Sequence, residues 1–105
     1  MRIIRLYSSL PTTTVAQTIG KQILRSGTSV GAHYREGYRS RSDAEIISKW
    51  GGALQELEET LYWLEVMVEA EVMAEDRLAD LARECGELIA IFTASIKTVK
   101  ARSHG

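Results

Sequence analysis

Hydrophobic residues recur at alternating spacings of three and four through the middle of the chain, at Ile47, Trp50, Leu54, Leu57, Leu61, Leu64 and Val68. This heptad spacing places their side chains along one face of an α-helix. Ser42 followed by Glu45 is a capping-box pattern, which predicts the start of that helix. The sequence therefore predicts a long amphipathic helix that begins after Ser42 and ends around residues 71–74, where the periodicity weakens.

Two further stretches show helical periodicity on either side of this helix. After the N-cap candidates Thr12–Thr14, a helix expected to end near Arg41 carries Val15, Ile19, Ile23, Val30 and Tyr34 on its apolar face. The acidic pair Glu75 and Asp76 suits the first turn of another helix, whose apolar stripe consists of Leu78, Leu81, Cys85, Leu88, Phe92, Ile96 and Val99. Each stripe predicts one buried helix face.

Residues 2–9 are predicted to form a short amphipathic helix that Pro11 stops. Because so short a helix is marginal alone, we expect either that it docks onto a neighbouring helix or that the chain start lies inside a longer reading frame, which would make this helix truncated. The short connections between the predicted helices imply antiparallel neighbours. We therefore expect a single all-α domain over residues 1–105, an antiparallel up-and-down four-helix bundle with a short first helix.

The composition narrows the class of protein. Hydrophobic residues make up 45% of the 105 residues and charged residues 26%, which suits a globular core rather than a disordered chain. The single cysteine, Cys85, excludes an internal disulfide and is expected in the core. No apolar run approaches the roughly 20 residues that span a bilayer, and the N-terminal residues lack the pattern of a charged segment, an apolar run and a small-residue cleavage site. We therefore expect a cytoplasmic protein without membrane contact.

Charge is distributed unevenly, although the formal net charge is −1. Residues 1–49 carry eight Lys/Arg against three Asp/Glu, whereas residues 50–90 carry two against eleven. Residues 91–105 are basic again, through Lys97, Lys100 and Arg102, which suit the negative end of a helix dipole. Such asymmetry permits a basic face on a nearly neutral protein.

Residue types that serve catalysis or metal binding do not occur in suitable patterns. The two histidines, His33 and His104, are far apart, and no Glu is followed three residues later by His. The segment 27–31 lacks the Gly-Lys-Ser/Thr ending of a phosphate loop. We therefore expect no enzymatic activity, no metal and no cofactor, and we assign Gly27 and Gly31 to close helix packing.

The segment between Arg25 and Lys49 mixes cations with aromatic rings. The candidate nucleic-acid-binding residues in it are Arg25, Arg35, Arg39, Arg41, Lys49, Tyr34 and Tyr38. Arginine and lysine neutralise phosphates, and tyrosine stacks on exposed bases. The opposing interpretation is that Glu36, Asp43 and Glu45 partly neutralise this segment, and that the two tyrosines lie at the edge of the core or in a subunit contact.

Three blocks of the sequence resemble a known protein family. They are Gln22–Gly37 (QILRSGTSVGAHYREG), Arg41–Ile46 (RSDAEI) and Ala53–Thr60 (ALQELEET). These blocks are similar to the L-R-x-small-x-S-(V/I)-x-A-N-x-x-E-(G/A), R-S-x-x-E-(F/I) and L-x-E-L-E-T patterns of the 23S ribosomal RNA intervening-sequence protein family. The chain departs from the family at His33, where asparagine is usual, and in its shorter first helix.

The resemblance implies a left-handed antiparallel four-helix bundle, without enzymatic activity, that assembles into a homo-oligomer, most often a pentamer. Accessory variability determinant proteins of diversity-generating retroelements are similar to this family, and they bind nucleic acid and a reverse transcriptase through a basic surface. On this chain the resemblance would place that surface at Arg25, Arg35, Arg39 and Arg41. It also implies ion pairs of Glu36 or Glu56 with arginines, within or between subunits.

Two hypotheses about function follow. In the first, the oligomer is a nucleic-acid-binding accessory protein that joins several weak basic surfaces, one on the second helix of each copy, into one site for RNA or DNA. In the second, the protein is a structural or protein-interaction module whose arginines form intersubunit salt bridges, with no nucleic-acid binding. Burial of these arginines in ion pairs would distinguish the second hypothesis from the first.

Overall fold

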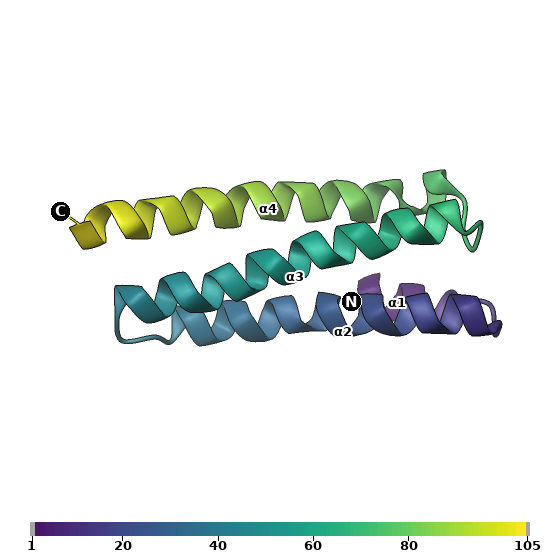
Figure 1. Cartoon of the computed structure of the whole chain (residues 1–105), viewed down its shortest axis with the longest axis horizontal. Coiled ribbons are helices and arrows are strands. Elements are labelled where there is room, and N and C mark those ends of the chain that lie inside the picture. Colours follow the sequence, from purple (N-terminus) through teal and green to yellow (C-terminus); the bar gives the residue numbers. More distant parts are fainter. Residues whose placement is uncertain (1, 105) are drawn as a thin grey trace.

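The computed structural model describes residues 2–104, and within them it contains four α-helices (Figure 1). They are α1 (Arg2–Ser9), α2 (Thr14–Tyr38), α3 (Asp43–Glu69) and α4 (Glu75–His104). Consecutive helices run in opposite directions, and the bundle is 51 Å long and 20 by 18 Å across (Figure 1). The predicted all-α up-and-down bundle with a short first helix is confirmed.

Side-chain caps set the starts of α2 and α3. The hydroxyl of Thr13 accepts a hydrogen bond from the backbone N–H of Ala16 at 3.2 Å. The hydroxyl of Ser42 accepts one from the backbone N–H of Glu45, also at 3.2 Å. Helix α2 ends at Tyr38 rather than near Arg41, because Ser42 must adopt an extended backbone to cap α3 and the intervening residues form the turn.

Helix α3 ends at Glu69, slightly earlier than the periodicity predicts. A Schellman turn follows, in which Val72 N–H donates to the Met67 carbonyl and Glu71 N–H donates to the Val68 carbonyl, both at 3.0 Å. Glu71 adopts a φ of 58°, in the left-handed region that non-glycine residues rarely visit. This turn reverses the chain sharply, so that α4 begins at Glu75, as predicted, and lies beside α3.

Helix α3 lies at the centre of the bundle and packs against both α2 and α4 (Figure 1). Its buried residues are Ala53, Leu57, Thr60, Leu64 and Met67. The hydroxyls of Ser26 and Thr60 share a hydrogen bond of 2.7 Å, which satisfies the polar atoms inside the α2–α3 contact. The predicted burial of Cys85 is confirmed, and this burial raises the pKa of its thiol.

Helix α1 docks onto α2 where two glycines allow a close approach. A Cβ on Gly20 would collide with Leu10, and one on Gly27 would lie 2.9 Å from Cγ1 of Ile3. Arg2 also forms an ion pair of 3.1 Å with Glu84, which links α1 to α4. The short helix is therefore stabilised by its neighbours, and the packing role predicted for Gly27 is found.

Next to α1, an open apolar groove of about 380 Å³ runs between α2 and α4. It is lined by Val30, Gly31, Tyr34, Trp50, Leu88, Ile91, Phe92 and Ser95. Tyr34 and Leu88, two residues of the predicted apolar stripes, are 47% and 39% exposed because no described helix covers them. The close packing expected at Gly31 is not found within residues 2–104, since a Cβ there would meet nothing within 4 Å.

Truncation of Leu57 tests the assignment of the core. Because Leu57 is only 3% exposed, Leu57→Ala should lower the free energy of unfolding by about 2–5 kcal/mol through lost burial and a residual cavity. Leu61→Ala, in the same heptad series but at a partly buried position, should cost less. Urea denaturation followed by circular dichroism measures both, and an unchanged midpoint for Leu57→Ala would contradict this core.

Alanine at two glycines of α2 should have opposite effects on stability. Gly31→Ala should raise the free energy of unfolding by about 0.5–1 kcal/mol, because the helix gains a better helix former and the new methyl group meets no neighbour. Gly37→Ala should lower it, because the new methyl group would collide with the indole ring of Trp50. Thermal unfolding of the two variants is the measurement, and shifts of the same sign would refute the arrangement.

Candidate nucleic-acid interface

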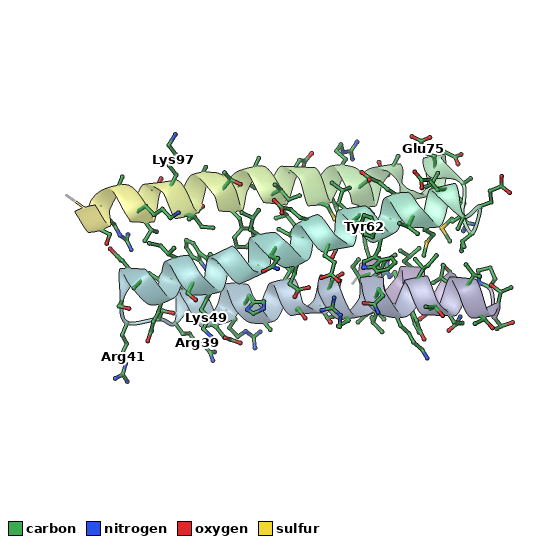
Figure 2. All side chains as sticks on the ribbon, viewed as in Figure 1. Arg39, Arg41, Lys49, Tyr62, Glu75 and Lys97 are labelled. Atoms are coloured by element: carbon green, nitrogen blue, oxygen red, sulfur yellow. The ribbon has the colours of Figure 1, made fainter. Side chains whose placement is uncertain are left out.

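Most of the predicted site residues gather at the end of the bundle that holds the α2–α3 turn. Tyr34, Arg35 and Tyr38 lie in the last turns of α2, Arg39 and Arg41 lie in the turn itself, and Lys49 follows in α3. Figure 2 shows Arg39, Arg41 and Lys49 at this end, with Arg41 pointing away from the bundle. Three segments therefore contribute to one surface, which we call the basic end.

Arg25 lies apart from this cluster and is held by two carboxylates of α3. Its guanidinium forms an ion pair with Glu59 and another with Glu56, the latter at 3.4 Å. The hydrogen bond to Glu59 is the main cause that raises the pKa of Arg25, and the same bond lowers the pKa of Glu59. Because both partners belong to the same chain, this pair ties α2 to α3, and we leave Arg25 out of the interface.

Lys49 is also paired, but in a more open position. Its ammonium lies 3.0 Å from a carboxylate oxygen of Glu36, and both side chains are about half exposed. The hydrogen bond from Lys49 lowers the pKa of Glu36. Exposed ion pairs of this kind contribute little to stability, so Lys49 can exchange Glu36 for an external anion at small cost.

Arg35, Arg39 and Arg41 are exposed and unpaired. Among residues 2–104, no carboxylate lies within 4.0 Å of any of these three guanidinium groups. Asp43, the nearest acidic residue in sequence to Arg41, pairs with Arg102 instead, and Glu45 accepts a hydrogen bond from the Arg41 backbone N–H at 3.3 Å. The partial neutralisation considered from the sequence therefore does not reach these side chains within the chain.

An aromatic cluster lies on helices α2, α3 and α4. Tyr34 is nearly parallel to Trp50, with ring centroids 6.0 Å apart, and its centroid lies 6.3 Å from that of Tyr38. Phe92 meets Tyr34 and Trp50 edge-on, at 5.8 and 6.3 Å. The Trp50 indole N–H donates to the Tyr34 carbonyl oxygen at 3.3 Å, so the backbone of α2 fixes the ring of α3. The cluster runs from buried Phe92 to Tyr38, which is 75% exposed.

The C-terminus of α4 adds basic residues that sequence reasoning assigned only to a helix dipole. Arg102 lies 2.8 Å from Asp43 at the start of α3, and Lys97 and Lys100 precede it on α4. Figure 2 shows Lys97 in the same half of the bundle as Arg39 and Arg41 but pointing to the opposite side, and it shows Glu75 at the other end. The predicted antiparallel order of helices was the signal that could have placed them here, because it brings the end of α4 to the start of α3.

The opposite end of the bundle is acidic. The end of α3, the following turn and the start of α4 carry Glu69, Glu71, Glu75, Asp76 and Asp80. The same half of the bundle also holds Arg2 and Arg5 of α1, Lys21 of α2, and Arg77 and Arg83 of α4. The acidic residues are therefore partly neutralised there, and a polyanion should be attracted more strongly to the basic end.

The described part of the chain contains neither a metal-binding group of side chains nor a membrane-spanning helix. Within residues 2–104, no group of three or more His, Cys, Asp or Glu side chains is arranged to hold a metal ion. His33 instead packs against Gly52, where a Cβ would lie 3.1 Å from its Nδ1 atom; the side chain of His104 lies outside the described residues. None of the helices described is long and apolar enough to cross a membrane.

Comparison with known proteins agrees with the family resemblance. The model of a family described as 23S rRNA-intervening sequence protein matches residues 1–94. A crystal structure of a protein with unknown function from the S23 ribosomal protein family of Bacteroides thetaiotaomicron VPI-5482 is similar, with 36% sequence identity and a TM-score of 0.86. The match covers 91% of this chain and 86% of that one. No curated protein sequence matches the chain.

The Asp43–Arg102 pair should make stability depend on pH. The hydrogen bond from Arg102 lowers the pKa of Asp43 below its ordinary value of 3.8. A carboxyl whose pKa is lower in the folded chain stabilises the fold above its unfolded pKa, and this contribution is lost as the pH falls through the folded pKa. Asp43→Asn should therefore be less stable than the unmodified protein at neutral pH, with the difference shrinking from about pH 5 toward pH 2.

Thermal unfolding across this pH range, with Arg102→Ala as the matched variant, is the measurement. Both variants remove the same pair, so both should converge on the unmodified protein in acid. If the difference in stability between Asp43→Asn and the unmodified protein stayed constant with pH, the ion pair would not be its cause.

Proposed function

The chain belongs to the 23S rRNA-intervening sequence protein family, and we propose that it is a non-enzymatic protein that binds nucleic acid through its basic end. The observation that carries the proposal is the presence of three exposed, unpaired guanidinium groups on Arg35, Arg39 and Arg41. They lie on a chain whose formal net charge is −1, so their grouping is not a consequence of a basic composition. Lys49 and the basic residues of α4 extend the same end.

Phosphate binding is the chemistry that this arrangement suits best. A guanidinium presents a planar set of N–H donors that matches phosphate oxygens, and each phosphate contact releases condensed counterions from the nucleic acid. Three such contacts would weaken binding about 20- to 40-fold when salt rises from about 50 to about 200 mM. The acidic residues at the far end would repel a nucleic acid that lay along the whole length of the bundle. The protein would therefore contact the nucleic acid with its basic end only.

Self-association forms part of this proposal. Three contacts per copy give a weak site, and joining copies raises the effective concentration of the remaining sites once one is bound. Apolar side chains that stay partly exposed along the α2–α4 groove, namely Tyr34, Leu88 and Ile91, provide surface that a second copy could cover. Light scattering on the samples used for binding would give the number of copies per particle.

Fluorescence anisotropy tests the proposal directly. Labelled RNA hairpin and labelled DNA duplex are titrated with the protein at about 50 and about 200 mM salt. Binding should weaken steeply with salt and should be lost in the variant Arg35→Ala/Arg39→Ala/Arg41→Ala. These three side chains are exposed and form no ion pair within the described chain, so their removal should leave the unfolding midpoint unchanged.

The matched control is Arg5→Ala/Lys21→Ala/Arg77→Ala, which removes the same charge from exposed positions in the other half of the bundle. This control variant should keep most of the affinity for nucleic acid, because the proposal attributes binding to the position of the three arginines and not to the net charge. Equal losses in both triple variants would contradict a localised site. Absence of binding at the lower salt would favour the alternative function, an interaction module whose arginines pair with acidic residues of a neighbouring subunit.

A further inference from the structure

We infer that Tyr38 is a stacking platform for an unpaired base, so that the basic end binds single-stranded RNA or DNA in preference to duplex. This inference rests on the proposed function and specifies the class of nucleic acid. Tyr38 is the last residue of α2 and is 75% exposed, more than any other exposed large hydrophobic residue in the described chain. A tyrosine ring this exposed offers π surface to a planar ligand.

Tyr38 is the exposed end of a series of neighbouring aromatic rings. The Tyr34 ring centroid lies 6.3 Å from that of Tyr38 with an angle of 25° between the rings, and the Trp50 ring lies 6.0 Å from Tyr34 at 7°. Trp50 is held in turn by its hydrogen bond to the Tyr34 carbonyl oxygen and by the space that Gly37 leaves for its indole. A base that stacks on Tyr38 would therefore extend an aromatic series that begins at buried Phe92, and little side-chain ordering would oppose binding.

Unpaired cations lie next to this ring along the chain. Arg39 follows Tyr38 directly, Arg35 lies one helical turn before it, and Arg41 lies in the same interhelical turn as Arg39. Stacking platforms beside cations that follow the phosphate backbone are the usual means of binding single strands without sequence preference. In a duplex, neighbouring base pairs cover the faces of each base, so Tyr38 could stack only on a base that had left the helix.

A second exposed tyrosine provides an internal comparison. Tyr62 on α3 is 56% exposed and contacts Trp63 edge-on at 5.1 Å. One turn away on either side lie acidic residues, Glu58 and Glu65, which would repel phosphates. Figure 2 places Tyr62 toward the middle of the bundle, far from Arg39 and Arg41. Exposure of a tyrosine alone therefore does not make a nucleic-acid site, and Tyr62 is the matched control.

The test compares oligonucleotides of one length. Labelled single strands of uridine and of deoxyuridine, each about 12 nucleotides long, and a duplex of the same length are titrated at about 50 mM salt. The unmodified protein should bind the single strands more tightly than the duplex. Tyr38→Ala should weaken single-strand binding about 5- to 150-fold, whereas Tyr38→Phe, which keeps the π face, and Tyr62→Ala should each change it less than about 2-fold. The ratio between uridine and deoxyuridine strands identifies whether RNA or DNA is preferred.

The possible failures can be told apart. Absence of binding to every oligonucleotide, or binding that the Arg35, Arg39 and Arg41 substitutions leave unchanged, would overturn the proposed function together with this inference. Binding that needs those arginines but is unaffected by Tyr38→Ala, or is as tight for the duplex, would overturn the inference alone. Equal losses in Tyr38→Ala and Tyr38→Phe would also overturn it, because they would assign the contact to the hydroxyl group rather than to the ring.

Discussion

Helix α3 packs against α2 on one side and against α4 on another, and the rest of the structure depends on this double contact. A helix with two neighbours needs a wide apolar surface, and α3 provides it through Leu57, Leu64 and Met67 together with the hydrogen-bonded hydroxyl of Thr60. Both contacts are antiparallel, so the end of α2 and the end of α4 are both brought to the start of α3 (Figure 1). The basic end is thus a product of helix packing, because it combines segments that are far apart in the chain.

Much of the fold could be predicted because its signals are local. The heptad spacing and the Ser42–Glu45 cap predicted α3, and Pro11 predicted the end of α1. The errors lie at helix ends and at the open groove, where local signals compete with tertiary structure. Helix α2 stops at Tyr38 because the next helix needs an extended Ser42. Leu88 follows the helical period yet is exposed, since periodicity gives the face of a helix but does not show whether another helix covers it.

The candidate site was predictable only in part. The mixture of arginine and tyrosine near Arg35–Arg41 was visible in the sequence, and the structure leaves those arginines unpaired within the described chain. The pairing of Arg25 with Glu56 and Glu59 was not predictable in detail, because it depends on how α2 and α3 are rotated about their axes. The same holds for Arg102 and Asp43, which are 59 residues apart and meet only because α4 has the length to reach the start of α3.

The open groove has a consequence for how the molecule fluctuates. Along Leu88–Ser95 the face of α4 that lines the groove toward α2 is open to solvent, whereas nearer its start α4 also contacts α1, through Glu84 and Arg2. Local opening of the second half of α4 should therefore cost less free energy than opening of α3. Its amide hydrogens should exchange with solvent faster than those of α3. The end of the bundle that carries Arg35, Arg39 and Arg41 should thus be locally less stable than the centre of α3. A ligand that bridged α2 and α4 at this end would stabilise the closed state of the second half of α4. Amide hydrogens there that do not touch the ligand would then also exchange more slowly.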